Sequence, residues 1–242
     1  MKICVAQTRP FTGDVQTNIE QHHRLIGEAA SLGADMIIFP ELSLTGYEPT
    51  LAVGLATSPD DHRFDTLQQL STTAGVVIGV GMPTINVAGI CISMILFQPG
   101  NTRQIYSKKY LHADEEPFFV SGDNLSGLIL HKTNAALAIC YELSVPEHAE
   151  QAWKNGSSVY IASVAKTARG MDQASNRLSN VANTYSMTVL LSNCVGLCDG
   201  DLCAGRSAAW DNTGKLIGQL NDRDEGILIV DTGTHQMLTR KF

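Results

Sequence analysis

The sequence lacks any long apolar run, so we expect no membrane-spanning helix. No uninterrupted apolar stretch approaches the roughly 18 residues that such a helix needs. The first residues, Met1 to Gln7, are a short apolar segment without the longer hydrophobic core of a secretory signal peptide. We therefore expect a cytoplasmic protein.

Positive charge is also scarce. The 242 residues include 17 Lys and Arg against 24 Asp and Glu, a formal net charge of −7, and no basic run is longer than two residues. Nucleic acids bind basic faces, and anionic membrane surfaces attract polybasic segments. We expect neither as a partner. Hydrophobic residues make up 44% of the chain, which suits a folded protein with a large core.

No linker or low-complexity tract interrupts the chain, so residues 1–242 are expected to form a single domain. Its six cysteines would stay reduced in the cytoplasm. Three of them follow the pattern Cys194-x3-Cys198-x4-Cys203. Structural zinc sites need a fourth ligand and usually Cys-x2-Cys spacing, and the next histidine, His235, lies far along the chain. The pattern favours reduced thiols near an active site, and we expect no metal.

Hydrophobic patterns predict an α/β protein. Strands neighbour strands between 76 and 106 and again after 205, which fits two mixed sheets packed on each other with helices outside. Thr17-Asn-Ile-Glu20 is expected to begin the first helix as a capping box. The expected strands are 2–7, 35–39, 76–81, 90–97, 104–106, 135–140, 158–164, 188–193, 207–210, 216–220 and 226–231, and the expected helices are 17–32, 64–74, 146–155 and 172–186.

Three chemically distinct groups each follow an apolar segment. Met36-Ile-Ile-Phe-Pro-Glu41 ends in a carboxylate, Ile105-Tyr-Ser-Lys108 in an ammonium, and Ala135 to Cys140 in a thiol. The carboxyl ends of buried strands are where α/β enzymes place reactive groups. Amide hydrolysis needs a deprotonated thiol, a held oxyanion and a protonated leaving amine. A buried Glu can move the protons, and an ammonium favours both anions.

The segments around these residues resemble the motifs of the nitrilase superfamily of carbon–nitrogen hydrolases. Phe39-Pro-Glu41 resembles the motif that carries the general base, Tyr106-Ser-Lys108 the oxyanion motif, and Ile139-Cys140-Tyr141-Glu142 the nucleophile motif. Glu115 matches the position of a second active-site glutamate. The match continues through Asn193-Cys-Val-Gly196 and Gly205-Arg-Ser207, so it covers essentially the whole chain.

The resemblance implies a four-layer α-β-β-α sandwich that often dimerises, and a reaction without a cofactor. It assigns Glu41 as general base, Cys140 as nucleophile, and Lys108 with the backbone N–H of Tyr141 as oxyanion donors. Glu115 would orient Lys108 or the substrate. The expected substrate is a small amide or carbamoyl compound that releases ammonia, so the expected partners are this substrate and a second copy of the chain.

Departures from the family pattern concern the substrate. Members commonly have His at the position of Tyr110 and Asp at that of Glu142, and an Arg often stands where this chain has Ser144. These differences argue against a small diacid monoamide. Other candidate pocket residues are Glu142, Tyr47 and Phe119; for each of them a structural role is an open alternative.

Several alternatives remain open at this point. Lys109 and Glu116 compete with their neighbours Lys108 and Glu115, and the motif phase favours the latter pair. A Cys–His hydrolase would use His112 or His148 as the base. A member without catalysis would bind metabolites or partners. Within the same fold, nitrile hydrolysis or acyl transfer would use the same thiol, although nitrilases typically carry Trp where Tyr141 stands.

Overall fold

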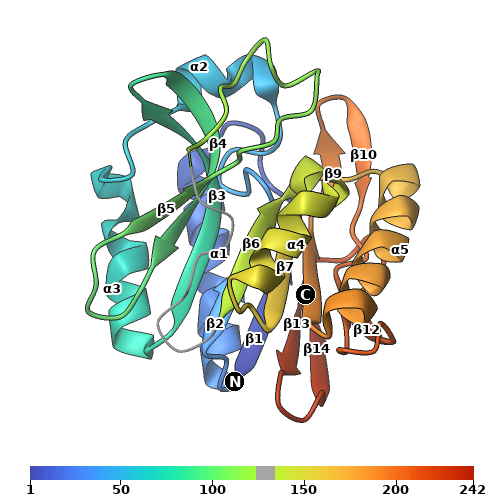
Figure 1. Ribbon diagram of the computed structural model, residues 1–242. Coiled ribbons are helices and arrows are strands. Elements are labelled where there is room, and N and C mark those ends of the chain that lie inside the picture. Colours follow the sequence, from blue (N-terminus) through green and yellow to red (C-terminus); the bar gives the residue numbers. More distant parts are fainter. Residues whose placement is uncertain (124–133) are drawn as a thin grey trace.

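The computed structural model describes residues 1–123 and 134–242 and shows two β-sheets packed face to face between helices (Figure 1). The first sheet has the order β14-β13-β1-β2-β3-β4-β5, with β1 Lys2–Gln7, β2 Met36–Ile38, β3 Val77–Asn86, β4 Gly89–Phe97, β5 Gln104–Ser107, β13 Gly226–Asp231 and β14 Met237–Lys241. The second has the order β12-β11-β8-β7-β6, with β6 Ala135–Ile139, β7 Val159–Val164, β8 Thr188–Asn193, β11 Ala208–Trp210 and β12 Leu216–Gln219.

A separate hairpin and the helices complete the fold. The hairpin pairs β9 Val195–Cys198 with β10 Asp201–Ala204. The α-helices are α1 Val15–Ser31, α2 Ala52–Leu55, α3 Asp65–Ala74, α4 Pro146–Lys154 and α5 Ala168–Tyr185, and the 3-10 helices are η1 Pro49–Leu51, η2 His62–Phe64 and η3 Cys140–Ser144. No helix of the described residues is long and apolar enough to cross a bilayer.

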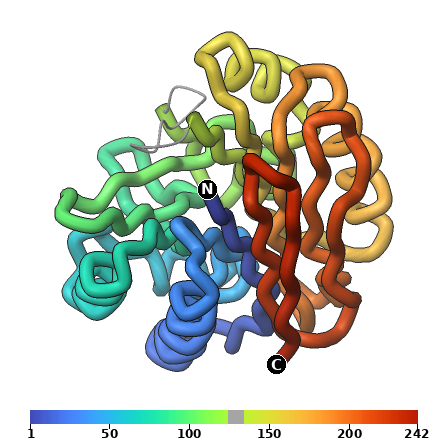
Figure 2. Tube along the Cα trace, turned by 90° about the horizontal axis from the view of Figure 1, so that it is seen from below, coloured from blue at the N-terminus to red at the C-terminus, as the bar shows by residue number. Residues whose placement is uncertain are grey.

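Three hydrophobic clusters confirm the expected four-layer α-β-β-α sandwich. The central cluster fills the space between the sheets, where Ile38 and Met94 of one sheet meet the layer of Ile139 and Ile161 of the other. A second cluster packs α1 and α3 on the outer face of the seven-stranded sheet, and a third packs α4 and α5 on the five-stranded sheet. Figure 2 shows the two pairs of helices on opposite sides of the strands.

The chemistry-bearing ends of the strands gather at one edge of the sandwich. β1 and β2 run parallel, as do β6, β7 and β8, so their carboxyl ends point the same way. The two sheets are also joined there, because Ser163 Oγ donates to the carbonyl of Phe39 at 2.8 Å and Ser192 Oγ donates to that of Ala6 at 2.6 Å. The residues after β2 and β6 therefore face a shared space.

The first helix corrects one expectation. It begins at Val15, and the cap is Asp14, whose Oδ1 accepts a hydrogen bond from the N–H of Thr17 at 3.1 Å. The proposed capping box beginning at Thr17 was therefore wrong, because a better cap lies three residues upstream. The helix predicted at 172–186 likewise begins earlier, at Ala168.

Three strands were missed by the sequence patterns. They are β9 and β10 of the hairpin and β14, whose five residues are all exposed. An exposed strand carries no alternation of buried and polar residues, and β9 and β10 are only four residues long.

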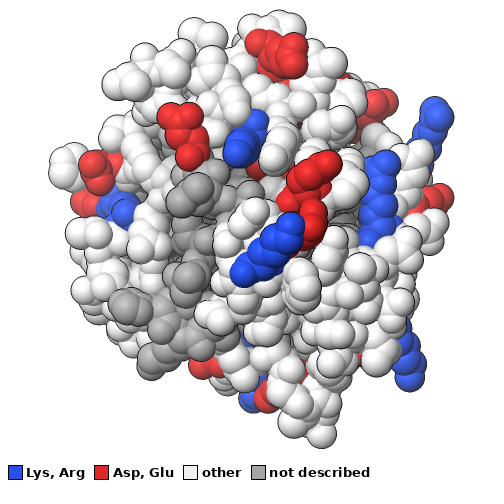
Figure 3. Space-filling model, in the orientation of Figure 1, with Lys and Arg blue, Asp and Glu red and all other residues white. Residues whose placement is uncertain are grey.

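Charged side chains are dispersed on the face seen in Figure 3. Lys and Arg lie among Asp and Glu there, and no continuous basic patch covers this face. The arrangement agrees with the acidic balance of the sequence.

Candidate active site

Glu41 is positioned by a tight turn just beyond β2. The next residue, Leu42, has a positive φ of 49°, and the turn packs directly on β3. A Cβ at Gly81 would lie 2.2 Å from the backbone nitrogen of Leu42, so only glycine permits this approach. Ser43 Oγ accepts from the N–H of Gly81 at 3.1 Å and fixes the turn further. The carboxylate is thereby held with its side chain buried.

Lys108 follows β5 and lies between two carboxylates. Its Nζ donates to Oε1 of Glu41 at 2.9 Å and to Oε1 of Glu115 at 2.6 Å. All three residues are at most 3% exposed. The competing residues Lys109 and Glu116 are exposed instead, so the structure brings together the pair that the motif phase favoured.

Glu115 is itself held by two further hydrogen bonds. Its Oε1 accepts from the hydroxyl of Tyr47 at 3.0 Å, and its Oε2 accepts from the backbone N–H of His112 at 2.8 Å. Both oxygens of Glu115 are thus occupied. In contrast, Oε2 of Glu41 is buried with no hydrogen-bond partner among the described residues. Of the two carboxylates, Glu41 keeps an oxygen that can take up a proton.

Cys140 directly follows β6 and begins η3. Its backbone has a positive φ of 44°, an uncommon conformation for a residue with a side chain and one that marks functional turns. The turn is stabilised by Glu142, whose carboxylate accepts from the N–H of Ile139 at 2.8 Å and from the N–H of Lys109 at 2.7 Å. These bonds tie the Cys140 turn to the segment that carries Lys108.

Burial and charge set the protonation of the thiol and its neighbour. Burial raises the pKa of the Cys140 thiol to about 11, helped by the charge of Glu41, while Lys166 and Lys108 act against this rise. Burial also raises the pKa of Glu41 above its ordinary value, and the ammonium of Lys108 opposes that shift. A neutral thiol thus lies beside a carboxylate of raised proton affinity, a combination suited to transferring the thiol proton.

The ammonium of Lys108 remains charged. Burial alone would lower its pKa, but Glu41, Cys140 and Glu115 together hold it above the ordinary value. A permanent buried cation at this point favours any anion that forms nearby.

Cys140 opens onto a pocket of about 220 Å³. Of the predicted site residues, Tyr47, Glu115 and Tyr141 also line it. Four other predicted site residues do not line it: Glu41 and Lys108, which are almost fully buried, and Phe119 and Glu142. Phe119 belongs to the core between the sheets, and Glu142 is fully buried behind the Cys140 turn. The remaining lining residues are His112, Asp114, Ala165, Lys166, Thr167, Cys198, Asp199, Asp201 and Cys203.

Lys166 is a pocket residue that the sequence reasoning missed. It follows β7 and lines the pocket with Cys140, and its charge lowers the pKa of the thiol. Asn193 clamps its backbone, accepting from the N–H of Lys166 at 2.9 Å and donating to its carbonyl at 3.1 Å. The signal was present, because Lys166 stands just past an apolar strand, as Glu41 and Lys108 do.

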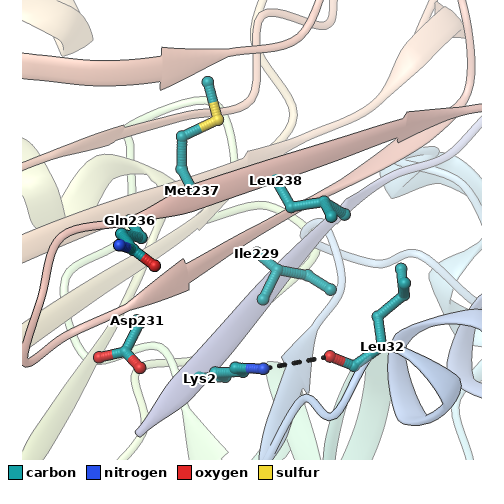
Figure 4. Close-up of a pocket in the computed structure, with 7 residues that line it drawn as sticks. All are labelled: Lys2, Leu32, Ile229, Asp231, Gln236, Met237 and Leu238. Carbon is teal, nitrogen blue, oxygen red and sulfur yellow. Dashed lines mark hydrogen bonds between the residues drawn. The ribbon is translucent and has the colours of Figure 1, made fainter.

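A second cavity, of about 240 Å³, lies where β1, β13 and β14 meet the end of α1 (Figure 4). Its polar groups include Lys2, whose ammonium donates to the carbonyl of Leu32 at 3.5 Å, and Asp231. Its seven lining residues include no Cys, Ser or His. This cavity therefore lacks the nucleophile that the first pocket provides.

Comparisons with known proteins show the family of the chain. A family model described as carbon-nitrogen hydrolase matches residues 2–237. An (R)-stereoselective amidase of Pseudomonas sp is 24% identical, with 98% of this chain and 86% of that protein covered. A 2-oxoglutaramate amidase of Bacillus subtilis is 25% identical, with 89% and 84% covered. The match to a glutamine-dependent NAD(+) synthetase of Thermotoga maritima covers 96% of this chain but only 42% of that protein.

Solved structures show the same fold. The amidase from Nesterenkonia sp. AN1 superposes with a TM-score of 0.85 at 22% identity, covering 96% of this chain and 92% of that one. One structure of a mutant of that amidase contains acrylamide added to the active-site cysteine. Another mutant was solved in complex with butyramide, and it superposes with a TM-score of 0.86.

Proposed function

Because this chain belongs to the carbon–nitrogen hydrolase family, we propose that it is an amidase that works through a thioester on Cys140. The family makes it a hydrolase acting on C–N bonds. The proposed substrate is a small amide or carbamoyl compound, and the proposed nitrogen product is ammonia. Relatives along most of the chain are amidases by name, which supports this choice within the family.

One observation carries the proposal: the Lys108 ammonium bridges Glu41 and Glu115 beside the Cys140 thiol. A buried ion pair with two carboxylates and one ammonium is costly to maintain for structure alone. Here the free oxygen of Glu41 and the raised pKa of its carboxyl provide a proton acceptor next to a nucleophile. These features match the three demands of amide hydrolysis.

The first half-reaction transfers the acyl group to sulfur. Glu41 takes the thiol proton as Sγ of Cys140 attacks the amide carbon, and the carbonyl oxygen becomes an oxyanion. Lys108 and the backbone N–H of Tyr141 stabilise this oxygen. The C–N bond then breaks, Glu41 returns its proton to the leaving nitrogen, and ammonia departs from a thioester.

The second half-reaction releases the acid. A water molecule gives a proton to Glu41 and attacks the thioester carbon, and the oxyanion forms again in the same place. The C–S bond then breaks and the thiol recovers the proton from Glu41. Glu115 acts by positioning Lys108, because both of its oxygens are already occupied by hydrogen-bond donors.

The pocket supports a compact acyl group. At about 220 Å³ it lies below the usual range for drug-sized ligands, roughly 300–1,000 Å³. Lys166 supplies a cation in its wall, and Asp114, Asp199 and Asp201 supply carboxylates. We propose that the acyl part is small and polar.

The alternative with a histidine base has less support. His112 lines the pocket, but its Nδ1 is 2.6 Å from Oδ1 of Asp114, and its side chain is more than half exposed. His148 is buried, with its two ring nitrogens hydrogen-bonded to the hydroxyls of Tyr106 and Tyr160. A His112→Ala variant is expected to retain turnover. Full loss of activity in that variant, with Glu41→Gln still active, would favour the Cys–His mechanism.

Trapping of the intermediate tests the proposal directly. The intact protein is incubated with a pool of small amides, and its mass is read before and after addition, together with released ammonia. We expect a mass increase that equals one acyl group, present while substrate is being turned over and absent in Cys140→Ala. Ammonia release by Cys140→Ala equal to wild type would refute the mechanism. A nitrile pool run in parallel distinguishes nitrile hydrolysis, and an added amine acceptor distinguishes acyl transfer.

Two expectations about the whole protein also stand as proposals. We propose a homodimer, which light scattering on the purified chain measures directly. We also propose a cytoplasmic location, which agrees with six free cysteines and is tested by cell fractionation.

A further inference from the structure

Three thiols form a compact cluster beside the candidate active-site pocket, and two of them line it. Cys194, Cys198 and Cys203 have sulfur atoms that all lie within 4.8 Å of one another, and Sγ of Cys194 is 3.3 Å from Sγ of Cys198. Their exposed fractions are 1%, 5% and 2%. The proposed reaction uses none of them.

The β9–β10 hairpin creates the cluster. Its turn is Asp199-Gly200, and both residues have positive φ angles, 50° and 79°, as a two-residue type I′ turn requires. The tight turn sets Cys203 opposite Gly196 in the neighbouring strand. A Cβ at Gly196 would lie 3.0 Å from Nη1 of Arg9, so the glycine makes room for that side chain beside the hairpin.

The two faces of the hairpin differ sharply. Leu197 and Leu202 pair with each other on the outer face and are 65% and 67% exposed. The cysteines lie on the inner face, where Tyr47 and Ala165 pack against them. Burial of free cysteines is ordinary, because Cys is among the residue types most often fully buried. The closeness of the three sulfurs to one another is what marks this face.

We propose that these three thiols bind a thiophilic d¹⁰ cation such as Zn²⁺. Thiolate ligands select such ions. A Zn–S bond of about 2.3 Å in tetrahedral geometry places neighbouring sulfurs about 3.8 Å apart. The Cys194–Cys198 separation of 3.3 Å is shorter than that value and no pair is more than 4.8 Å apart, so small side-chain rotations are enough. Each Zn–S bond replaces an S–H bond, and the proton passes to solvent.

The fourth position of the ion would face the substrate pocket. Cys198 and Cys203 line that pocket together with Cys140, whereas Cys194 does not. Three protein ligands with one open position are the arrangement in which zinc keeps an exchangeable ligand. The spacing Cys-x3-Cys-x4-Cys argued against a metal because the sequence offers no fourth protein ligand. In the proposed site, a water molecule or a ligand in the pocket would take the fourth coordination position.

The hairpin is anchored on both sides, so the cluster is preorganised. The N–H of Asp199 at the turn donates to Oε1 of Glu48 at 3.1 Å. On the other side, the N–H of Ala204 donates to the carbonyl of Lys166 at 2.9 Å. A site whose ligands are already held together loses little conformational entropy on binding.

Titration of the full, reduced and metal-stripped protein tests the proposal. Cd²⁺ serves as the probe, because its bonds to thiolates give an ultraviolet charge-transfer band, and Zn²⁺ then competes for the same site. We expect one Cd²⁺ per chain, displaced by Zn²⁺. Cys203→Ser is expected to weaken the affinity by about 100-fold, since the strong binding of such sites is shared among few thiolates. Far-ultraviolet circular dichroism checks that this variant is folded.

Two control variants separate this site from other thiols. Cys91→Ser removes a buried thiol of β4 outside the cluster and should leave Cd²⁺ binding unchanged. Cys140→Ala should also bind Cd²⁺ like wild type, so the metal site is measured independently of amide hydrolysis. Binding below one ion per chain in the reduced protein, or equal binding by Cys203→Ser, overturns the proposal. A Cys194–Cys198 disulfide as the only observed chemistry would overturn it too.

Discussion

Two buried polar networks flank the Cys140 turn, and they differ in how completely they are satisfied. On the pocket side, Lys108 bridges two carboxylates and Oε2 of Glu41 has no partner. On the far side, Glu142 accepts from Ile139 and Lys109 and also from the hydroxyl of Tyr106 at 2.7 Å. Behind it, His148 bonds through both ring nitrogens.

This difference distinguishes a network suited to proton transfer from one that only holds the Cys140 turn in place. A buried network in which every atom is paired rigidifies its surroundings, whereas an unpaired buried oxygen is a cost that a reaction can justify. Glu41 and Glu142 are both buried glutamates within a few residues of a strand end. Only Glu41 keeps the free oxygen, so we assign proton transfer to Glu41 and positioning of the nucleophile turn to Glu142.

Glu41→Gln gives the largest expected effect. It keeps the size of the side chain and an oxygen for Lys108 but removes the proton acceptor, so kcat should fall by about 10²–10⁴-fold. Lys108 retains Glu115 as its counter-ion, so Tm should not fall. Steady-state kinetics and a thermal melt measure both. Near-normal turnover in this variant would end the assignment of Glu41 as base.

Glu142→Gln should have the opposite profile. In the glutamine, an NH₂ group replaces one carboxylate oxygen and faces backbone N–H groups that donated to that oxygen. At least one buried N–H group then has no acceptor, which costs about 1–3 kcal/mol of stability. In a protein of this size, Tm should fall by roughly 2–12 °C. The kcat falls less than in Glu41→Gln and KM stays near wild type. Exposed Glu147→Gln on α4 is the matched control. A loss of kcat without a loss of Tm would instead place Glu142 in the chemistry.

The pH profile sharpens the same comparison. Glu41 must be ionised to accept the thiol proton, so activity is lost as pH falls through its folded pKa. Burial raises that pKa, so the acid limb of kcat/KM should have its midpoint above the ordinary value of about 4.3. The limb should persist in Glu142→Gln, because Glu142 transfers no proton. If the midpoint of the acid limb lies at or below the ordinary glutamate pKa, the assignment of Glu41 as the base is contradicted.

Lys166→Met gives the smallest expected effect. Loss of this charge raises the pKa of the Cys140 thiol, so the pH profile of its alkylation by iodoacetamide should move to higher pH, by up to about one unit. Lys109→Met is the matched control, because Lys109 is exposed and stacks over the ring of Tyr110. Equal profiles for the two variants would remove Lys166 from the electrostatics of the site.

The sequence predicted the clustering of Glu41 and Lys108 better than it predicted the side chains around them. Glu41, Lys108 and Cys140 each follow an apolar run, and parallel strands bring such positions to one edge of a sheet. Whether a neighbouring side chain faces the pocket depends on the conformation of the turn after each strand. The hydrophobic periodicity of the sequence does not reveal that conformation. For this reason Tyr47 was placed in the pocket correctly, whereas Glu142 and Phe119 lie behind it.

Other misses had a readable signal. Asp199-Gly200 is a strong two-residue hairpin sequence, and it would have predicted β9 and β10. Asp14 is a better helix cap than Thr17, and it precedes the apolar residue Val15. The clustering of Cys203 with Cys194 and Cys198 had no such signal, because it depends on the register of the hairpin.

The pairing of β1 with β13 also sets the point during synthesis at which the seven-stranded sheet can be completed. Lys2 pairs with Asp231 and Gln7 with Gly226, and β1 lies inside the seven-stranded sheet, not at its edge (Figure 2). Such distant contacts form slowly and late. The sheet that supports Glu41 and Lys108 is therefore incomplete until residues 226–231 have left the ribosome. Until then, a nascent chain carries Cys140 without the completed sheet that holds Glu41 and Lys108 in place.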